Sequence, residues 1–306
     1  MGKRKQVLFC TSLTYAYLCI MKYEEVWKRL TTVYDDHEAK AVARYLLEIR
    51  YGLTMTNIIC GKVESLSEEE LKAMLNRLLK GEPVQYVTGV AEFGGRRFHV
   101  EPGVLIPRPE TAELCQWIVS SLHTPHSSLH ILDIGTGSGC IACTLAAELP
   151  ESKVTAWDIS DEALRIAQEN AQNNHVHINI EKVDILSISH STLLTPHSSK
   201  YNIIVSNPPY ICNKEREGME QNVLDHEPSL ALFVPDEAPL LFYRAITRFA
   251  KTALQDGGNL YFEINPLYAQ PLEQLMQEEG FSDIRFRYDS FGKQRFARGT
   301  FYKHPS

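Results

Sequence analysis

The chain has 306 residues, of which 44% are hydrophobic and 23% are charged, a composition typical of globular proteins with one large domain or two of ordinary size. The formal net charge is -7 and the isoelectric point is near 5.9, so no global positive field attracts phosphate backbones. A nucleic-acid substrate would need a local basic face, and Lys and Arg are instead interleaved with Asp and Glu along the chain.

The N-terminal segment combines a basic cluster at residues 3–5 with an apolar run over residues 7–20. This pattern is similar to a signal peptide, but the end of the run lacks the small residues of a cleavage site. The run is also shorter than the ~20 residues that span a bilayer. We expect residues 1–20 to be a non-native or disordered extension, with Met21 as the natural start and no membrane partner.

Residues 23–80 carry apolar side chains at three- and four-residue spacing, which predicts several short helices. Ser67 is expected to cap one helix at its N-terminus, with Glu70 at the capping-box position. Gly81-Glu82-Pro83 is expected to end that helix. We therefore expect a small helical domain over residues 21–83.

Residues 84–104 are rich in glycine and alternate in short stretches, which predicts a β-hairpin linker. From residue 105 onward, β-prone stretches alternate with helix-like segments, which predicts a parallel sheet covered on both faces over residues 105–306. The β-prone stretches are residues 131–132, 154–157, 178–180, 203–205, 259–264, 284–288 and 295–302. Only residues 289–293 separate the last two, too few for a helical crossover, so these strands should pair antiparallel.

Cysteine and histidine usage does not indicate a metal site. The seven cysteines lie at positions 10, 19, 60, 115, 140, 143 and 212, an odd number that does not suit a disulfide framework and indicates a reducing cytoplasm. Cys140 and Cys143 have redox-pair or half-zinc-site spacing, but no second pair follows, so we expect them to pack in the core. His123, His126 and His130 are expected to be solvated loop residues. No metal is predicted.

A glycine-rich segment follows the first β-prone stretch of this region and reads Asp133-Ile134-Gly135-Thr136-Gly137-Ser138-Gly139. Glycines let the backbone turn tightly and approach a ligand at the N-terminus of a helix, here expected at residues 141–148. Cys140 stands where a dinucleotide fingerprint has its third glycine, so the pattern is G-x-G-x-G. This favours S-adenosylmethionine over a nicotinamide dinucleotide.

Acidic residues follow the next two predicted strands. Asp158 ends the second, where a carboxylate suits both hydroxyls of a ribose, and Asp184 and Ile185 follow the third, where an acceptor beside an apolar residue suits an adenine. Parallel α/β folds bind ligands at the carboxyl ends of their strands. Each acid alone would more simply be a helix cap or a surface residue, but together with the glycine-rich segment they predict a cofactor site.

Asn207-Pro208-Pro209-Tyr210 follows the fourth predicted strand. Two prolines remove two backbone donors and fix φ, so the segment forms a rigid extended corner. The Asn207 side-chain oxygen and the Pro208 carbonyl are two acceptors for a planar NH2 group, and Tyr210 would stack on that group. A simple turn is the alternative, although it does not call for an aromatic residue at the ligand-binding edge. We predict that this corner aligns a planar amine or amide nitrogen for methyl transfer.

The sequence resembles the HemK/PrmC family of release factor glutamine methyltransferases over nearly everything after Met21. The most specific matches are Gly81, Pro83, Gln85, Tyr86, Gly89, Phe93, Phe98, Val100 and Val104-Leu105-Ile106-Pro107-Arg108-Pro109-Glu110-Thr111, in register before the glycine-rich segment and Asn207. Two features depart from the family: residues 1–20 match nothing, and Asn265 stands where relatives often have glycine.

The resemblance implies an α/β fold, a seven-stranded Rossmann-like class I methyltransferase domain with its last strand antiparallel. A small helical domain that helps recognise the release factor and a β-hairpin linker would precede it. The implied reaction moves a methyl group from S-adenosylmethionine to the side-chain amide of the Gly-Gly-Gln glutamine in bacterial class 1 peptide chain release factors. Residues 135–139, Asp158, Ile185 and Asn207 would contact the cofactor, and residues 207–210 would hold the glutamine.

Two other functions share parts of this pattern. An adenine-specific nucleic-acid methyltransferase has the same cofactor loop and corner, but needs a basic, aromatic groove and usually a target-recognition domain. A translation-factor binding module with an inert core is disfavoured, because Asp133, Asp158 and Asn207 are intact. Arg108 would either line the site entrance or act as a structural ion-pair partner. We expect a cytoplasmic enzyme with no direct nucleic-acid substrate.

Overall fold

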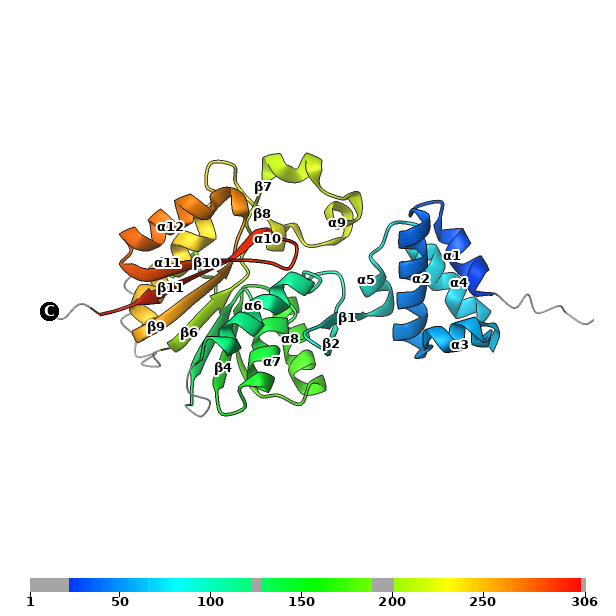
Figure 1. Ribbon diagram of the computed structural model, residues 1–306, viewed down its shortest axis with the longest axis horizontal. Coiled ribbons are helices and arrows are strands. Elements are labelled where there is room, and N and C mark those ends of the chain that lie inside the picture. Colours follow the sequence, from blue (N-terminus) through cyan, green and yellow to red (C-terminus); the bar gives the residue numbers. More distant parts are fainter. Residues whose placement is uncertain (1–21, 66, 123–127, 189–200, 304–306) are drawn as a thin grey trace, which may run out of the picture. The chain divides into compact units, whose positions relative to one another are not determined.

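The computed structural model describes residues 22–65, 67–122, 128–188 and 201–303 (Figure 1). The chain divides into two compact units, Met1–Lys80 and Gly81–Ser306. The expectations for residues 1–20 and for His123 and His126 concern positions outside the described residues.

The described part of the first unit is helical. Its α-helices are α1 (Tyr23–Leu30), α2 (Asp36–Tyr51), α3 (Met55–Ile59) and α4 (Glu68–Leu78), with a 3₁₀ turn at Lys62–Ser65. Asp35 caps the N-terminus of α2, where its carboxylate accepts hydrogen bonds from the backbone N–H groups of His37 and Glu38 at 2.8 Å each. The helix ends at Gly52, where φ is 65°, a conformation that glycine adopts without strain. The predicted helical content is confirmed.

The predicted capping box of α4 does not form. Ser67 occupies the N-cap position, but its side chain makes no capping hydrogen bond. The Glu70 carboxylate instead accepts two hydrogen bonds from the Arg50 guanidinium, at 3.0 and 2.7 Å. An ion pair between α2 and α4 therefore takes the carboxylate that local capping would have used.

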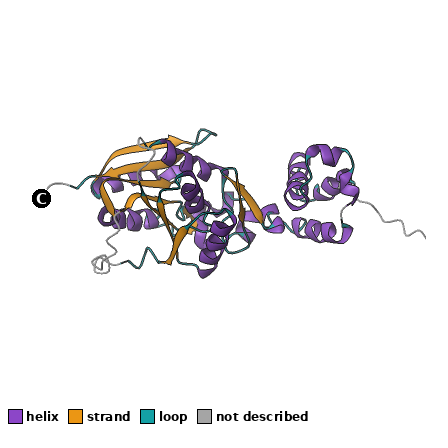
Figure 2. Ribbon diagram, turned by 90° about the horizontal axis from the view of Figure 1, so that it is seen from below, coloured by secondary structure: helices purple, strands orange, loops and turns teal. Residues whose placement is uncertain are grey.

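The second unit is built on a seven-stranded sheet (Figures 1 and 2). Its strands are β3 (His130–Ile134), β4 (Lys153–Asp158), β5 (Ile178–Lys182), β6 (Tyr201–Ser206), β9 (Leu254–Glu263), β10 (Phe281–Tyr288) and β11 (Gln294–Phe301), in the order β10-β11-β9-β6-β3-β4-β5. Neighbouring strands from β9 to β5 pair in parallel, whereas β11 is antiparallel to both β9 and β10. The predicted fold class and the antiparallel final pair are confirmed.

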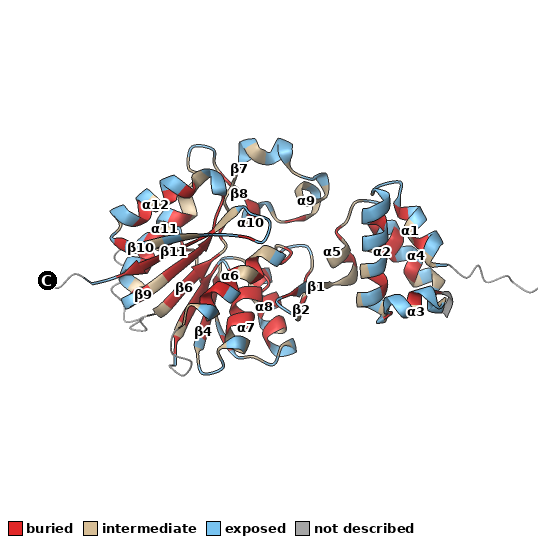
Figure 3. Ribbon diagram, in the orientation of Figure 1, coloured by how far each residue is buried: buried red, intermediate tan, exposed pale blue. Residues whose placement is uncertain are grey.

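Successive residues of the central strands point to opposite faces, and each face is covered by helices (Figure 3). Ile131 and Val205 belong to the buried cluster that includes residues of α6 (Pro109–Ser120) and α7 (Cys140–Glu148). Leu132 and Ile204 belong to the opposite cluster with α11 (Leu241–Ala253) and α12 (Ala269–Glu278). This two-sided burial is why the strands read as apolar runs in the sequence.

The region predicted as a hairpin linker is packed onto the sheet unit. Its first part is a short helix, α5 (Val84–Thr88), which ends at Gly89 with φ of 73°. The hairpin itself is narrower than predicted and consists of β1 (Val90–Phe93) and β2 (Arg96–His99), paired antiparallel. Phe93 and Phe98 are buried in the same cluster as α7. The predicted hairpin linker of residues 84–104 therefore contains a hairpin only over residues 90–99, and its start forms a helical turn that carries the buried Tyr86.

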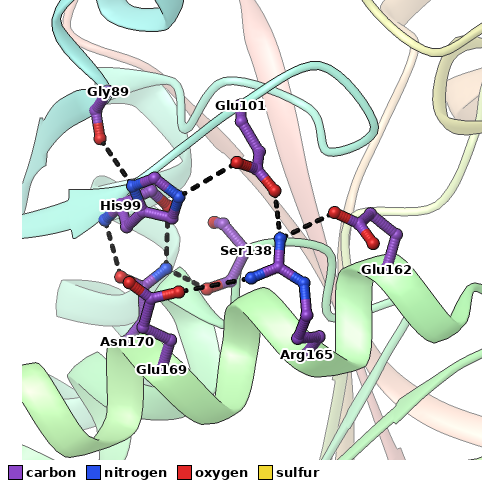
Figure 4. A network of polar contacts seen from close by, with 8 residues as sticks. All are labelled: Gly89, His99, Glu101, Ser138, Glu162, Arg165, Glu169 and Asn170. Carbon is purple, nitrogen blue, oxygen red and sulfur yellow. Dashed lines mark hydrogen bonds and ion pairs between the residues drawn. The ribbon is translucent and has the colours of Figure 1, made fainter.

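Asn170 joins this hairpin to the glycine-rich segment (Figure 4). It lies on α8 (Asp161–Asn173), is fully buried, and its side-chain oxygen accepts a hydrogen bond from the His99 N–H at 2.6 Å. Its side-chain nitrogen donates to the carbonyls of His99 and Ser138, at 2.9 Å each. Arg165, one turn earlier on α8, pairs with Glu101 just beyond β2. The hairpin and the glycine-rich segment thus share one anchor.

Candidate functional site

A cavity of about 370 Å³ lies at the carboxyl ends of β3, β4, β5 and β6. The predicted site residues that line it are Gly135, Gly137, Asp158, Asp184, Ile185, Asn207, Pro208 and Pro209. The predicted site residues that do not line it are Arg108, Asp133, Thr136, Ser138, Gly139 and Tyr210. The structure therefore divides the predicted set into residues that face the cavity and residues behind it.

The glycine-rich segment leaves β3 and turns back onto the end of β4. The backbone N–H groups of Gly135 and Thr136 donate to the Trp157 carbonyl at 2.8 and 2.9 Å. Gly137 donates its N–H to the Asp158 carboxylate at 2.9 Å. These bonds hold the segment against β4, so that Gly135, Gly137 and Asp158 border one cavity.

Gly137 and Gly139 serve different purposes, although both have positive φ, at 54° and 78°. A Cβ atom on Gly137 would have no neighbour within 4 Å, and this residue borders the cavity. A Cβ atom on Gly139 would lie 3.0 Å from the Cβ of Ala167 on α8. Gly137 therefore leaves space for a ligand, whereas Gly139 lets α7 begin close against α8.

Asp158 retains acceptor capacity on the cavity side. Its two oxygens accept hydrogen bonds from the N–H groups of Gly137 and Ser160, both at 2.9 Å. A carboxylate has about four lone-pair positions, so two remain for a ligand. Asp184 also borders the cavity, but its oxygens already accept from the Leu186 N–H at 2.9 Å and from the Ser187 hydroxyl, within the turn that follows β5. Ile185 beside it is buried and borders the cavity.

Asp133 lies behind the glycine-rich segment. It is fully buried, and it accepts a hydrogen bond from the Thr136 hydroxyl at 2.6 Å. Burial raises the pKa of Asp133 to about 7, although the hydrogen bonds from Thr136 and from the Ala142 backbone act in the opposite direction. Through the bond to Thr136, Asp133 holds the glycine-rich segment on the side of the protein core.

The Asn207–Tyr210 corner is held at both ends. The Asn207 side-chain NH2 group donates to the Thr111 hydroxyl oxygen on α6 at 3.3 Å, and the Tyr210 hydroxyl donates to Glu263 at 3.1 Å. Asn265, the departure from the family pattern, donates its NH2 group to the Tyr210 carbonyl at 3.2 Å. The Tyr210 ring packs against the cluster that contains α11 and does not border the cavity, so its stacking on a substrate stays a prediction.

Sequence analysis missed Thr111 and Glu263 as parts of this site. Both are only 2% exposed, and the Thr111 hydroxyl donates to the Glu263 carboxylate at 2.6 Å. Burial raises the pKa of Glu263, whereas Thr111, Arg295 and Tyr210 lower it. The available signal was the position of Glu263 at the carboxyl end of a β-prone stretch, the same edge as Asp158.

Arg108 forms an ion pair, which is the second of the two roles predicted for it. Its guanidinium lies 2.5 Å from the carboxylate of Glu227, a residue that sequence analysis missed and that has a side chain only 1% exposed. The second oxygen of Glu227 accepts the Ile106 N–H at 3.1 Å. Glu227 therefore holds residues 106–108 in place through both of its carboxylate oxygens.

The segment that contains Glu227 was not predicted. It lies between the short parallel strands β7 (Ile211–Cys212) and β8 (Phe233–Val234) and contains α9 (Gln221–His226) and α10 (Ser229–Leu232). Pro228 and the 62% exposed Leu230 border the cavity, as do Val104 and Leu105 of the chain that Glu227 holds. The ion pair thus connects two segments that line the cavity.

The remaining predictions concern metals and membranes. Cys140 and Cys143 are free thiols buried in the cluster with α7, which confirms core packing, and burial raises the pKa of each to about 12. Among the described residues, no group of His, Cys, Asp and Glu side chains suits a metal ion. In the same part of the chain, none of the helices combines the length and the apolar character needed to cross a bilayer.

Comparisons with known proteins match both parts of the chain. The model of the PrmC N-terminal domain matches residues 25–89, and that of the methyltransferase small domain matches residues 107–227. The release factor glutamine methyltransferase of Bacteroides thetaiotaomicron is 45% identical over 269 residues, covering 87% of this chain and 94% of the relative. That of Flavobacterium psychrophilum is 38% identical over 277 residues, covering 89% and 95%.

One solved structure is similar to this chain in fold but not closely in sequence. The T. thermophilus 16S rRNA N2 G1207 methyltransferase, in complex with AdoMet and guanosine, has a TM-score of 0.50 and 18% identity to this chain. The match covers 69% of this chain and 49% of that protein.

The buried Asp133 predicts a pH dependence of stability in the ligand-free protein. Its folded pKa of about 7 lies above the ordinary value of 3.8, so the stabilising effect of protonation is complete below pH 4 and is lost as pH rises through 7. Asp133→Asn removes this titration. We expect the difference in free energy of unfolding, wild type minus variant, to fall by up to about 1.4 kcal/mol per pH unit between pH 4 and 7. Urea denaturation at several pH values measures it, and parallel curves would contradict the assignment.

Proposed function

The chain belongs to the release factor glutamine methyltransferase family, and we propose that it methylates the side-chain amide nitrogen of a glutamine in a bacterial class 1 peptide chain release factor. The observation that carries this proposal is the anchored Asn207–Tyr210 corner, whose first three residues border a cavity beside Asp158 and the glycine-rich segment. The target would be the glutamine of the Gly-Gly-Gln motif. Such a substrate places the reaction in the cytoplasm, where translation takes place.

The cavity fits S-adenosylmethionine. Its volume of about 370 Å³ lies in the usual range of roughly 300–1,000 Å³ for small-molecule sites. Asp158 has unused lone pairs for the ribose hydroxyls, Ile185 is an apolar neighbour for the adenine, and Gly135 and Gly137 leave the backbone open to a ligand. When bound, this cofactor supplies an electrophilic methyl group on a sulfonium.

The corner residues would orient the substrate amide. An amide nitrogen is a poor nucleophile because its lone pair is delocalised, so alignment and polarisation are the contributions that a protein makes. The Asn207 side-chain oxygen and the Pro208 carbonyl would each accept one N–H of the glutamine NH2 group. Pro208 and Pro209 restrict the backbone, which keeps these two oxygens in place. The departing proton would pass to solvent or to a carbonyl oxygen.

The substrate assignment can be tested with methyl-labelled S-adenosylmethionine. The purified chain is incubated with a bacterial class 1 release factor, with the same factor carrying alanine in place of the Gly-Gly-Gln glutamine, and with adenine-containing DNA. We expect label only in the unaltered release factor. Label in the alanine variant would move the target to another residue, and label in DNA alone would favour the adenine methyltransferase.

Gly137→Val should abolish cofactor binding in a folded protein, because its side chain enters the cavity. The left-handed backbone conformation adds a stability cost of about 1–2 kcal/mol, which a folded domain tolerates. Calorimetric titration with S-adenosylhomocysteine measures the binding, and circular dichroism verifies the fold. Gly139→Val is the comparison, since its Cβ meets Ala167 and should reduce stability more strongly. Wild-type affinity in Gly137→Val would show that the loop is only structural.

Asn207 should be needed for the rate of methyl transfer. Alanine removes an acceptor and leaves an N–H of the substrate unpaired, which should cost about 1–3 kcal/mol, or roughly 5- to 150-fold in rate. Aspartate keeps an acceptor, but its charge stabilises the sulfonium ground state more than the transition state. We expect single-turnover rates on a release factor in the order wild type, Asp, Ala. Asn213→Ala, at an exposed position nearby, is the control. Equal rates for wild type and Asn207→Ala would reduce the corner to a turn.

A further inference from the structure

A continuous set of hydrogen bonds leads from a buried carboxylate to the cavity. Glu263 at the end of β9 accepts the Thr111 hydroxyl at 2.6 Å, and the Thr111 oxygen lies 3.3 Å from the side-chain nitrogen of Asn207. Glu263 and Thr111 are each 2% exposed, and neither borders the cavity. They can therefore act on a bound substrate only through the corner residues.

The direction of these hydrogen bonds follows from donor and acceptor chemistry. An ionised carboxylate only accepts, so the single O–H of Thr111 is committed to Glu263. The Thr111 oxygen is then left with lone pairs, and only the NH2 group of Asn207 can satisfy it. A flipped Asn207 amide would bring its oxygen against these lone pairs, with no hydrogen between them.

We infer that Glu263 and Thr111 are positioning residues that orient the Asn207 amide with its oxygen toward the substrate. This inference rests on the proposed function. With the orientation reversed, the Asn207 NH2 group would face the glutamine NH2 group, donor against donor. The same orientation selects for an NH2 group over a carboxylate, so it distinguishes glutamine from glutamate in the substrate.

The second oxygen of Glu263 holds the other end of the corner. It accepts the Tyr210 hydroxyl at 3.1 Å, while the backbone carbonyl of Glu263 accepts the Tyr243 hydroxyl at 3.0 Å. Both carboxylate oxygens thus face hydroxyl donors, which lower the pKa of Glu263 and oppose the rise that burial causes. One buried group thereby fixes Asn207 through Thr111 and Tyr210 directly.

Substitutions at Thr111 separate the effect of its hydroxyl on the orientation of the Asn207 amide from the effect of its side-chain volume on packing. Thr111→Val keeps the shape but has no hydroxyl, so we expect kcat to fall roughly 5- to 150-fold, with a smaller change in KM for the release factor. Thr111→Ser restores a hydroxyl and should recover most of the rate. Thr247→Val is the matched control, since Thr247 is fully buried and its hydroxyl has no hydrogen-bond partner in the described part of the chain.

A double-mutant cycle decides whether Thr111 acts through Asn207. In an Asn207→Ala background, Thr111→Val should cause no further loss of rate, because the group it orients is gone. Losses that multiply would overturn the inference and assign Thr111 a separate structural effect. An unchanged kcat in Thr111→Val would overturn it as well. Circular dichroism of every variant verifies that each is folded.

A measurement without substrate separates this inference from the proposed function. In protein with 15N-labelled asparagine, Asn207→Ala identifies the side-chain NH2 signal of Asn207. We expect that signal to shift and its hydrogen exchange to accelerate in Thr111→Val and not in Thr247→Val. If the wild type failed to methylate a release factor but the signal changed as expected, the orientation would stand and the proposed function would fail. An unaffected signal in Thr111→Val would overturn the orientation.

Discussion

Parallel pairing in register brings the site residues together. One row of paired residues crosses β4, β3, β6 and β9 and consists of Trp157, Ile134, Ser206 and Phe262. The residues that follow these four in the chain are Asp158, Gly135, Asn207 and Glu263. Strand spacing of about 4.8 Å then places neighbouring members of this set within reach of one another, and Asp158, Gly135 and Asn207 border the cavity. A register shift of one residue in any of these strands would turn its side chains to the other face of the sheet and break the set apart.

The residues around the glycine-rich segment divide into those that build it and those that face the cavity. Asp133 and Gly139 act inside the fold, the first by accepting the Thr136 hydroxyl and the second by allowing α7 to approach α8. Gly137 and Asp158 face the cavity. Such a division is expected where a backbone must approach a ligand closely, because each turn of the segment needs its own internal support.

Buried carboxylates perform similar tasks at two other places. Glu227 joins Arg108 and the Ile106 N–H beside the cavity, and Glu263 joins Thr111 and Tyr210 beneath the corner. Taking a carboxylate out of water is unfavourable unless donors surround it, so each of them requires a specific arrangement of the elements that supply those donors. A buried charge of this kind does not by itself indicate that the protein is more stable. The presence of Glu227 and Glu263 is instead consistent with a role in fixing the geometry of the site.

The sequence by itself determined the α/β class, the seven strands of the sheet, the antiparallel final pair, the glycine-rich segment and the Asn207–Tyr210 corner, because these depend on local periodicity and on motifs of a few residues. Only the tertiary structure decided that α5 replaces the start of the predicted hairpin, that Glu70 pairs with Arg50 instead of capping α4, and that Arg108 pairs with Glu227. The same holds for the connection from Glu263 to Thr111, which are 152 residues apart in the chain. Hydrogen bonds between such distant residues exist only after the sheet and its helices have assembled, so no local pattern in the sequence records them.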